Sequence, residues 1–392
     1  MPKTSNSHSI GQLLIIGFDG TEMSPRLASL LTKIQPAGVM LFARNIIGAE
    51  QTHELLRECQ KRVGSPLFTC VDLEGGTVDR FRNVIGSTPS PAEVFAAASR
   101  ALFRKHGRVI GENCRALGFN VDFAPVLDLA YEASRPVMSS RAVSDDPKRV
   151  ITYAREFLRG LGDAGIAGCG KHFPGLGEAT LDTHHELPSV HKSLRKLWEQ
   201  DLVPYRVLRR ELPMIMVSHA AFPAVTGVHK KKNEKEEDKE KNTGTPASLS
   251  KKWITDILRK KIGYRGLICS DDLEMGGVLA AAPIEEATVA HIRAGGDLAL
   301  ICHHEEFVLR AHEALTREAE RDSKLSRRVH ESARRVLAFK KRWLDKTSTP
   351  RRRAIAPTPA RVEKLTRELW EFGEEVRLAA LAGQNRAGGE RL

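Results

Sequence analysis

The feature that most constrains the fold of this chain is the alternation of short apolar runs with longer amphipathic stretches along most of its 392 residues. Longer stretches with helical periodicity cover 49–62, 91–117, 148–164, 197–210, 251–261 and 284–294. The runs that read as buried strands are 13–18, 37–42, 67–71, 121–127, 168–172, 214–219, 267–270 and 298–302. Such alternation predicts a parallel sheet covered by helices, and eight repeats favour a closed (β/α)8 TIM-type barrel.

An open doubly wound sheet is the structural alternative to the barrel. The residues after the first predicted strand are Gly17-Phe18-Asp19-Gly20, which lack the glycine spacing of a dinucleotide-binding turn. We therefore expect no Rossmann-type nucleotide site.

The chain is expected to form a single domain with extra C-terminal helices. Residues 1–345 are assigned to the catalytic barrel, and residues 346–392 to a connector and a helix packed on it. Within the barrel, the run HKKKNEKEEDKEKN at 229–242 has no apolar residue and cannot contribute to a core. We expect a disordered charged insertion over 229–244.

Composition restricts the partners. The formal net charge is +12, but no basic run is interleaved with aromatic residues, so nucleic acid is not expected as a partner. The six cysteines are scattered without a CxxC pair, which favours a reducing compartment and argues against a zinc cluster. The first ten residues are polar, and no apolar run reaches bilayer-spanning length. We expect a cytoplasmic protein, a monomer, with no membrane partner.

Polar residues collect where the predicted strands end. The third strand is followed by Asp72 and Glu74, and the other ends carry Asp128, Lys171-His172, Ser218-His219 and Ser270-Asp271-Asp272. Barrel enzymes place catalytic groups at the C-terminal ends of strands. Any one of these residues could simply cap a helix or orient a loop. Their coincidence at five strand ends predicts a polar pocket at one mouth of the barrel.

The loop after the fifth strand carries candidates for proton transfer. Asp182 and His184 are two residues apart, so in an extended segment their side chains point the same way. A carboxylate beside an imidazole fixes its tautomer and stabilises the imidazolium, which suits an acid/base near neutral pH. A hydrogen bond that only stabilises the loop is the alternative interpretation, and His185 is the rival acid/base. Adjacent histidines, as at 184–185 and 303–304, rarely aim at one ion, so no metal site is expected.

Several motifs together resemble a known family. They are KHFPGLGEATLDTH at 171–184, GVMLFARNI at 38–46, VDLEGGTVDRF at 71–81, Ser140-Arg141 before Asp145-Asp146-Pro147, and SDDLEMGG at 270–277. On these residues the chain resembles a bacterial β-N-acetylhexosaminidase of glycoside hydrolase family 3, of the single-domain type used in cell-wall recycling. The resemblance runs from about residue 11 to residue 302.

The resemblance implies a role for each matching residue. Asp271 would be the nucleophile, and His184, oriented by Asp182, would be the acid/base. Sugar hydroxyls would be held by Asp72, and the sugar subsite would be lined by Arg80, Arg141, Lys171 and His172, with His219 nearby. Relatives usually carry Gln in place of Leu73 and Arg-Val-Gln in place of Thr77-Val78-Asp79, so these departures bear on fine specificity.

The implied activity is a retaining exo-β-N-acetylglucosaminidase that removes terminal β-linked N-acetylglucosamine from small-molecule or oligosaccharide glycosides, muropeptides among them. No metal or organic cofactor is required for this chemistry. Three alternatives stay open at this point: a β-glucosidase or β-xylosidase of the same family, a phosphorylase, and an inactive sugar-binding barrel.

Overall fold

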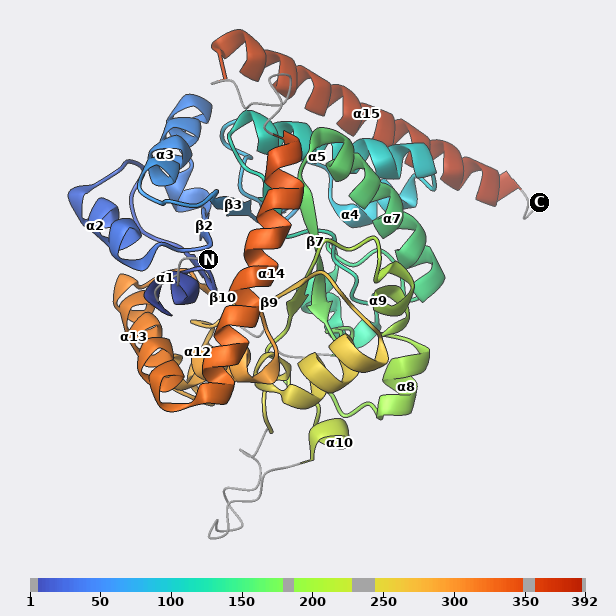
Figure 1. Ribbon diagram of the computed structural model, residues 1–392. Helices are drawn as coiled ribbons and strands as arrows, with labels where there is room; N and C mark the ends of the chain where they lie inside the picture. Colours follow the sequence, from blue (N-terminus) through green and yellow to red (C-terminus); the bar gives the residue numbers. More distant parts are fainter. Residues whose placement is uncertain (1–5, 179–186, 228–243, 348–356, 390–392) are drawn as a thin grey trace.

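A closed parallel β-barrel forms the centre of the computed structural model, which describes residues 6–178, 187–227, 244–347 and 357–389 (Figure 1). The order of strands around the barrel is β1-β10-β9-β8-β7-β6-β3-β2. Their bounds are β1 Leu14–Ile16, β2 Gly38–Met40, β3 Phe68–Val71, β6 Val121–Asp122, β7 Ala167–Phe173, β8 Met214–Val217, β9 Leu267–Asp272 and β10 Leu298–Ile301. The predicted (β/α)8 barrel is confirmed.

The barrel closes between the first and last strands. Leu14 pairs with Ala299 of β10, while Ile15 also pairs with Gly38 of β2. Every residue of β1, β2 and β10 is buried, because one face points into the barrel and the other lies under helices. This double burial explains why the strands are apolar throughout.

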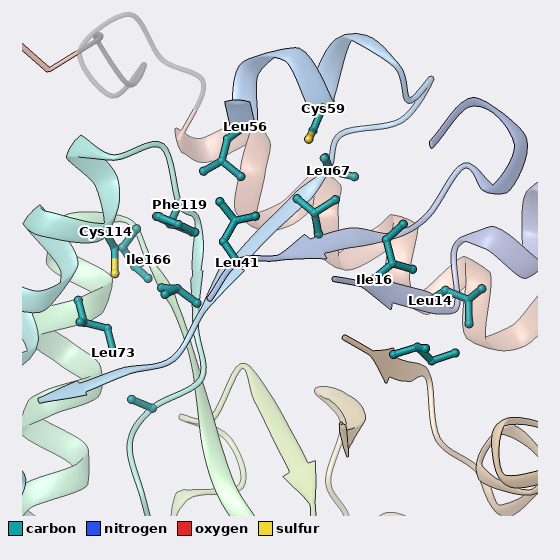
Figure 2. Packing of buried hydrophobic residues seen from close by; sticks show 14 of the residues in the cluster. Leu14, Ile16, Leu41, Leu56, Cys59, Leu67, Leu73, Cys114, Phe119 and Ile166 are labelled. Carbon is teal, nitrogen blue, oxygen red and sulfur yellow. The ribbon is translucent and has the colours of Figure 1, made fainter. Parts of the chain in front are cut away.

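Two apolar layers pack against the strands, one outside the barrel and one inside it. Between strands and outer helices, the layer includes Leu14, Ile16, Leu41, Leu56 and Phe119 (Figure 2). A second cluster fills the barrel itself and includes methionines such as Met214 and Met216. It also contains four of the six cysteines, all of which are buried free thiols; the four are Cys70, Cys169, Cys269 and Cys302. The cysteines therefore serve as small apolar side chains.

Helices cover the outside of the barrel. They are α2 Pro25–Ile34, α3 Ala49–Lys61, α5 Arg100–Ala116, α7 Pro147–Ala164, α8 Leu194–Glu199, α9 Val203–Leu208, the helix Lys252–Lys261, α12 Ile284–Ala294, α13 Glu305–Arg321 and α14 Ser323–Thr347. Shorter helices are α1 Asn6–Gly11, α4 Pro91–Ala96, α6 Arg135–Met138, α10 Pro223–Thr226 and α11 Gly276–Leu279. None of the helices within the described ranges is both long and apolar enough to cross a bilayer.

Three predicted elements differ from the structure, and one of them is the helix predicted over 197–210, which is divided into α8 and α9. The single helix predicted over 91–117 is divided into α4 and α5, because Ala98 has a positive φ of 51° and the Ser99 hydroxyl then caps α5. The strand predicted over 121–127 ends at Asp122. Pro125 has no N–H to donate, and only an isolated bridge between Val126 and Lys171 continues the pairing.

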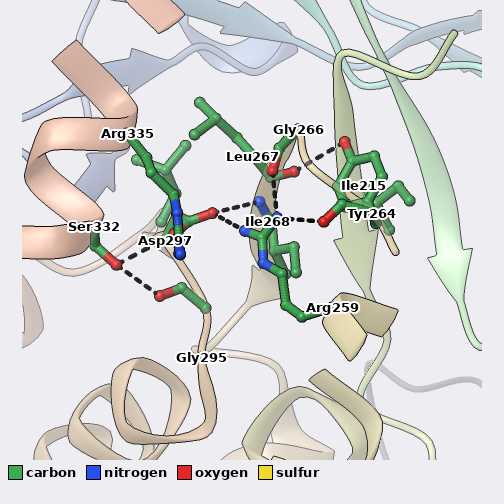
Figure 3. Close-up of polar contacts among 12 residues, drawn as sticks. Ile215, Arg259, Tyr264, Gly266, Leu267, Ile268, Gly295, Asp297, Ser332 and Arg335 are labelled. Carbon is green, nitrogen blue, oxygen red and sulfur yellow. Dashed lines mark hydrogen bonds and ion pairs between the residues drawn. The ribbon is translucent and has the colours of Figure 1, made fainter. Parts of the chain in front are cut away.

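A buried ionic network closes the bottom of the barrel, at the N-terminal end of β10 (Figure 3). Asp297, fully buried, accepts hydrogen bonds from the Ile268 backbone at 3.0 Å and from Arg328 at 3.0 Å. Arg259 and Arg335 pair with the same carboxylate. Because this end of a barrel serves stability, the network anchors α14 and the helix Lys252–Lys261 beneath the strands.

Lys340 of α14 reaches the same end of the barrel interior. Its side chain is buried, its Nζ donates to Gln12 Oε1 at 2.7 Å, and the ammonium lies 5.1 Å from the centre of the Phe68 ring. Burial lowers the pKa of Lys340 to about 7.

The last helix, α15 Pro359–Gly389, lies across α4 and α5 (Figure 1). Its buried face includes Leu369, Phe372 and Val376, and the Phe372 ring stacks on His106 with centroids 5.7 Å apart. Lys105 of α5 forms an ion pair with Glu375. The charged insertion expected at 229–244 lies, apart from Gly244, outside the described residues.

Candidate active site

The polar side chains of the strand ends meet at the C-terminal mouth of the barrel, around a cavity of about 220 Å³. Carboxylates and a guanidinium line this cavity together with apolar side chains such as Met40, Phe42 and Met216. The charged lining residues are Asp72, Arg80, Asp271, Asp272 and Glu274. Polar groups converging in a small, partly apolar cavity are typical of a binding site for one compact ligand.

A four-residue ionic cluster lies on the β3 side of this mouth. The Nζ of Lys171 is 2.7 Å from Asp72 Oδ1 and 2.6 Å from Glu74 Oε1. Arg141 binds both oxygens of Glu74, with Nε and a terminal nitrogen each at 2.7 Å. Burial alone would raise the pKa of Glu74, but Arg141 and Lys171 hold that pKa well below its ordinary value. Glu74 is therefore an anion that fixes two cations.

Arg80 is placed differently from Arg141. One of its terminal nitrogens lies 4.0 Å from Asp72 Oδ2, and its side chain lines the cavity. Its Nε is buried and has no hydrogen-bond partner among the residues that the structure describes. A buried guanidinium with an unused N–H is costly unless a ligand oxygen completes it. Asp72 and Arg80 thus offer an acceptor and a donor to hydroxyl groups in the cavity.

His172 is oriented by Asp128. The Nδ1 of His172 donates to Asp128 Oδ2 at 2.7 Å, and Asp128 also accepts from the backbone N–H groups of His172 and Leu176. The other ring nitrogen, Nε2, lies 3.4 Å from a terminal nitrogen of Arg141. Asp128 therefore fixes the imidazole and the start of the loop that follows β7.

Asp271 lies at the end of β9 and faces the cavity. One of its oxygens, Oδ1, accepts the backbone N–H of Asp272 at 2.8 Å. Burial alone would raise its pKa, but the nearby imidazoles of His219 and His172 lower the pKa below the ordinary value. Asp271 is thus ionised at neutral pH, as a carboxylate nucleophile must be.

His219 holds the C-terminal end of β9 by a hydrogen bond to its backbone. Its Nε2 lies 2.8 Å from the carbonyl oxygen of Asp272, which can only accept, so Nε2 carries the proton. Its Nδ1 then accepts from the Ser248 hydroxyl at 2.7 Å, and burial lowers the pKa of His219. Both ring nitrogens are engaged by the protein, which suits a residue that positions Asp271 more than one that touches sugar.

The adjacent histidines 303 and 304 contact different carboxylates. His303 Nε2 lies 3.1 Å from Asp272 Oδ2 and lines the cavity, whereas His304 pairs with Glu274. The hydrogen bond to Asp272 raises the pKa of His303. The two rings do not converge on one point.

The structure thus brings together most of the residues predicted for the site; these are Asp72, Arg80, Arg141, Lys171, His172, His219 and Asp271. Asp182 and His184, the predicted acid/base pair, lie outside the described residues. Sequence analysis gave no role to Glu74 or Asp128, although both follow strand ends. The signal for Glu74 is its spacing: it is two residues from Asp72, which places both carboxylates on one side of an extended segment.

Comparison with known proteins agrees with this geometry. Residues 7–339 match the family model described as the glycosyl hydrolase family 3 N terminal domain. The chain belongs to glycosyl hydrolase family 3. The family assignment agrees with the closed barrel and with the carboxylates gathered at its mouth.

Curated and solved relatives are similar over most of their length. A beta-hexosaminidase of Alkalilimnicola ehrlichii is 36% identical over 302 residues, covering 75% of this chain and 82% of that protein. A family 3 beta-N-acetylglucosaminidase structure from Paenibacillus has a TM-score of 0.81 at 31% identity, covering 94% of this chain and 69% of that one. A family 3 glycosyl hydrolase of Mycobacterium smegmatis has a TM-score of 0.74 at 29% identity, covering 86% and 97%.

Proposed function

We propose that this family 3 protein is a retaining exo-β-N-acetylglucosaminidase that removes terminal β-linked N-acetylglucosamine. The observation that carries the proposal is the ionised Asp271 at the cavity wall, opposite the hydrogen-bonding groups Asp72 and Arg80. The names of the hexosaminidase and acetylglucosaminidase relatives support the choice of sugar. The cavity has a volume suited to one terminal sugar residue, which supports exo action.

In the first step, Asp271 attacks the anomeric carbon and forms a glycosyl-enzyme ester while the glycosidic C–O bond breaks. His184, oriented by Asp182, gives its proton to the departing oxygen. In the second step His184 takes a proton from water, whose oxygen attacks the anomeric carbon and releases Asp271. Two displacements retain the β configuration. Asp72, Arg80, Lys171 and His172 hold the sugar, with Arg141 and His219 fixing their neighbours.

We further propose that the natural substrates are muropeptides handled during peptidoglycan recycling in the cytoplasm. The cell-wall-recycling enzymes that the sequence motifs resemble support this assignment. The six buried free thiols fit a reducing compartment.

The test is hydrolysis of an aryl β-N-acetylglucosaminide by the purified protein, with the first-formed anomer identified by NMR. The expected product is β-N-acetylglucosamine that mutarotates later. A panel of aryl β-glucosides and β-xylosides, and a parallel reaction with inorganic phosphate, serve as controls. An initial α product, preference for a glucoside, or a glycosyl phosphate as the main product would each contradict the proposal.

A further inference from the structure

A second and larger hollow lies outside the barrel mouth, between α15 and the loops that follow β3 and β6. This groove, which we call the α15 groove, has a volume of about 900 Å³. Cavities of roughly 300–1,000 Å³ are the size that hold compact organic ligands. The barrel-mouth cavity, at about 220 Å³, is much smaller. A glycoside that fills the small cavity with its terminal sugar leaves the rest of the molecule to be bound elsewhere.

The inner edge of the α15 groove adjoins the four-residue ionic cluster at the barrel mouth. Ser140, which lines the groove, directly precedes Arg141, and Gly76 lies two residues after Glu74. The hydroxyls of Thr77 and Ser140 are 3.2 Å apart and join the two loops. The groove therefore begins at the two loops that also carry Glu74 and Arg141 of the ionic cluster.

The outer wall is a firmly packed helix. Phe372 and Val376 of α15 are buried, and Phe372 stacks on His106 of α5. The opposite wall includes α4, where Ser90 and Glu93 cap the helix reciprocally. Since both walls are fixed by packing, the groove is present without any ligand. The residues of α15 follow the 7–339 span matched by the family model.

The lining combines hydroxyl groups, apolar side chains and one available cation. Thr77 and Ser140 offer hydroxyls, while Ala380 and Leu381 offer apolar surface. Arg82 bonds to the carbonyl of Gly76 and has no carboxylate partner within the described part of the chain. The other charged lining residues are already engaged: Glu93 accepts from Ser90 at 2.7 and 2.8 Å, and Arg377 pairs with Glu374 at 2.7 Å.

We propose that the α15 groove binds the leaving-group side of the substrate, an aglycone that carries amide or hydroxyl groups and at least one carboxylate. The inference rests on the proposed glycosidase function and specifies which glycosides that site prefers. The carboxylate is bound by Arg82, the apolar part lies along Ala380 and Leu381, and the hydroxyls of Thr77 and Ser140 contact the aglycone next to the scissile bond. The groove thus selects for what is attached to the sugar.

The experiment uses the full chain and two matched variants. Ala380→Glu places bulk and negative charge in the groove, and Ala382→Glu places the same side chain at an exposed position on α15 that does not line it. Hydrolysis is measured on a nitrophenyl β-N-acetylglucosaminide and on a β-1,4-linked N-acetylglucosaminyl–muramyl peptide. The free muramyl peptide is also titrated into each protein by calorimetry, which requires no catalysis. Arg82→Lys, compared with Arg82→Ala, tests the charge.

We expect Ala380→Glu to raise KM for the muramyl peptide substrate about five- to tenfold with the nitrophenyl substrate unchanged, because the new side chain fills the groove and repels the carboxylate of the ligand. Arg82→Ala should raise the same KM about two- to fivefold, as for loss of a partly exposed ionic contact, and Arg82→Lys should raise it less. In each of these variants, calorimetric affinity for the free muramyl peptide should fall by the same factor as KM rises, and Ala382→Glu should match the wild type. Suppose that every variant hydrolyses the nitrophenyl glycoside and that the ratio of KM for the muramyl peptide substrate to KM for the nitrophenyl substrate is the same in all of them. That result would overturn the groove assignment but leave the glycosidase function in place. If the wild type cleaves neither substrate, the proposed glycosidase function is wrong. If the wild type and the groove variants also bind the free muramyl peptide with equal affinity, the groove assignment is wrong as well.

Discussion

Glu74 and Arg141 form a bidentate pair in which two guanidinium nitrogens lie 2.7 Å from the two carboxylate oxygens. The Glu74 side chain is 1% exposed, so this pair sits almost entirely out of water. Because Lys171 shares the same carboxylate, one buried anion sets the position of two cations at the barrel mouth. Removing the charge of Glu74 leaves Arg141 without its bidentate partner and Lys171 with Asp72 alone.

We predict that Glu74→Gln lowers kcat/KM on an aryl β-N-acetylglucosaminide by about 10- to 100-fold and destabilises the fold by about 3 kcal/mol. The amide keeps the size of the side chain but not the charge that binds Arg141 and Lys171. Steady-state kinetics and thermal melting measure the two effects. Glu54→Gln, on the exposed face of α3, is the control. A lowered melting temperature with unchanged KM and kcat would show that Glu74 only stabilises the fold.

We predict that Asp271→Ala abolishes turnover while the melting temperature stays within a few degrees of the wild type. The alanine removes the carboxylate proposed to form the ester, whereas the strand is held by its neighbours. Incubation of the wild type with a fluorinated sugar substrate and peptide mapping by mass spectrometry should label Asp271. A label on Asp272 or on any glutamate would mean that the nucleophile lies elsewhere.

We predict that His184→Ala loses far more activity on a natural disaccharide than on a nitrophenyl glycoside. A nitrophenolate departs with little protonation, whereas a sugar alkoxide requires an acid. Asp182→Asn should show the same pattern more mildly, because the imidazole stays but loses its charged partner. External azide should partly restore the second step in the His184 variant. The matched control is His185→Ala, and equal losses on both substrates without azide rescue would leave His184 a role only in the loop.

We predict that Lys340→Met raises stability by about 2 kcal/mol at pH 7, with a gain that shrinks toward pH 10. The folded pKa of Lys340 is about 7, below the ordinary value of 10.5, so between these pH values the unfolded chain binds the extra proton. The free energy of unfolding of the wild type therefore increases as the pH rises through that window. Methionine does not titrate, so the variant lacks this pH dependence. Gln12 keeps the Ser65 hydroxyl as a donor in the variant.

Chemical denaturation of the wild type and Lys340→Met at several pH values between 7 and 10 provides the measurement. Lys341→Met, at an exposed neighbouring position, is the matched control and should change little. A stability difference between wild type and Lys340→Met that stays constant over this range would contradict the lowered pKa.

The barrel could be predicted from the sequence because doubly buried strands are apolar throughout and their spacing is regular. The predicted runs place every barrel strand, as with 37–42 for β2, although most observed strands are shorter. The elements that were predicted incorrectly depend on local backbone conformation. The left-handed Ala98 that separates α4 from α5 has no sequence signal, since alanine ordinarily favours helix.

The sequence predicted which residues lie at the site but not which of them contact one another. Strand ends identified Asp72, Lys171 and Asp271, because position in a barrel follows from strand order. That Glu74 bridges two cations, and that His219 donates to the Asp272 carbonyl, depends on side-chain directions across different strands. The groove beside α15 depends on where the last helix packs, which its amphipathic pattern leaves open.

The pairing of β1 with β10 has a consequence for the growing chain. Leu14 is synthesised long before its partner Ala299, because the other barrel strands are translated between them. Until then β1 presents an unpaired edge, which can recruit strands from other chains. The short length of β1 and its position between α1 and α2 limit that exposure while the ribosome completes the last strand. Translation speed over the second half of the message therefore sets how long the open sheet persists.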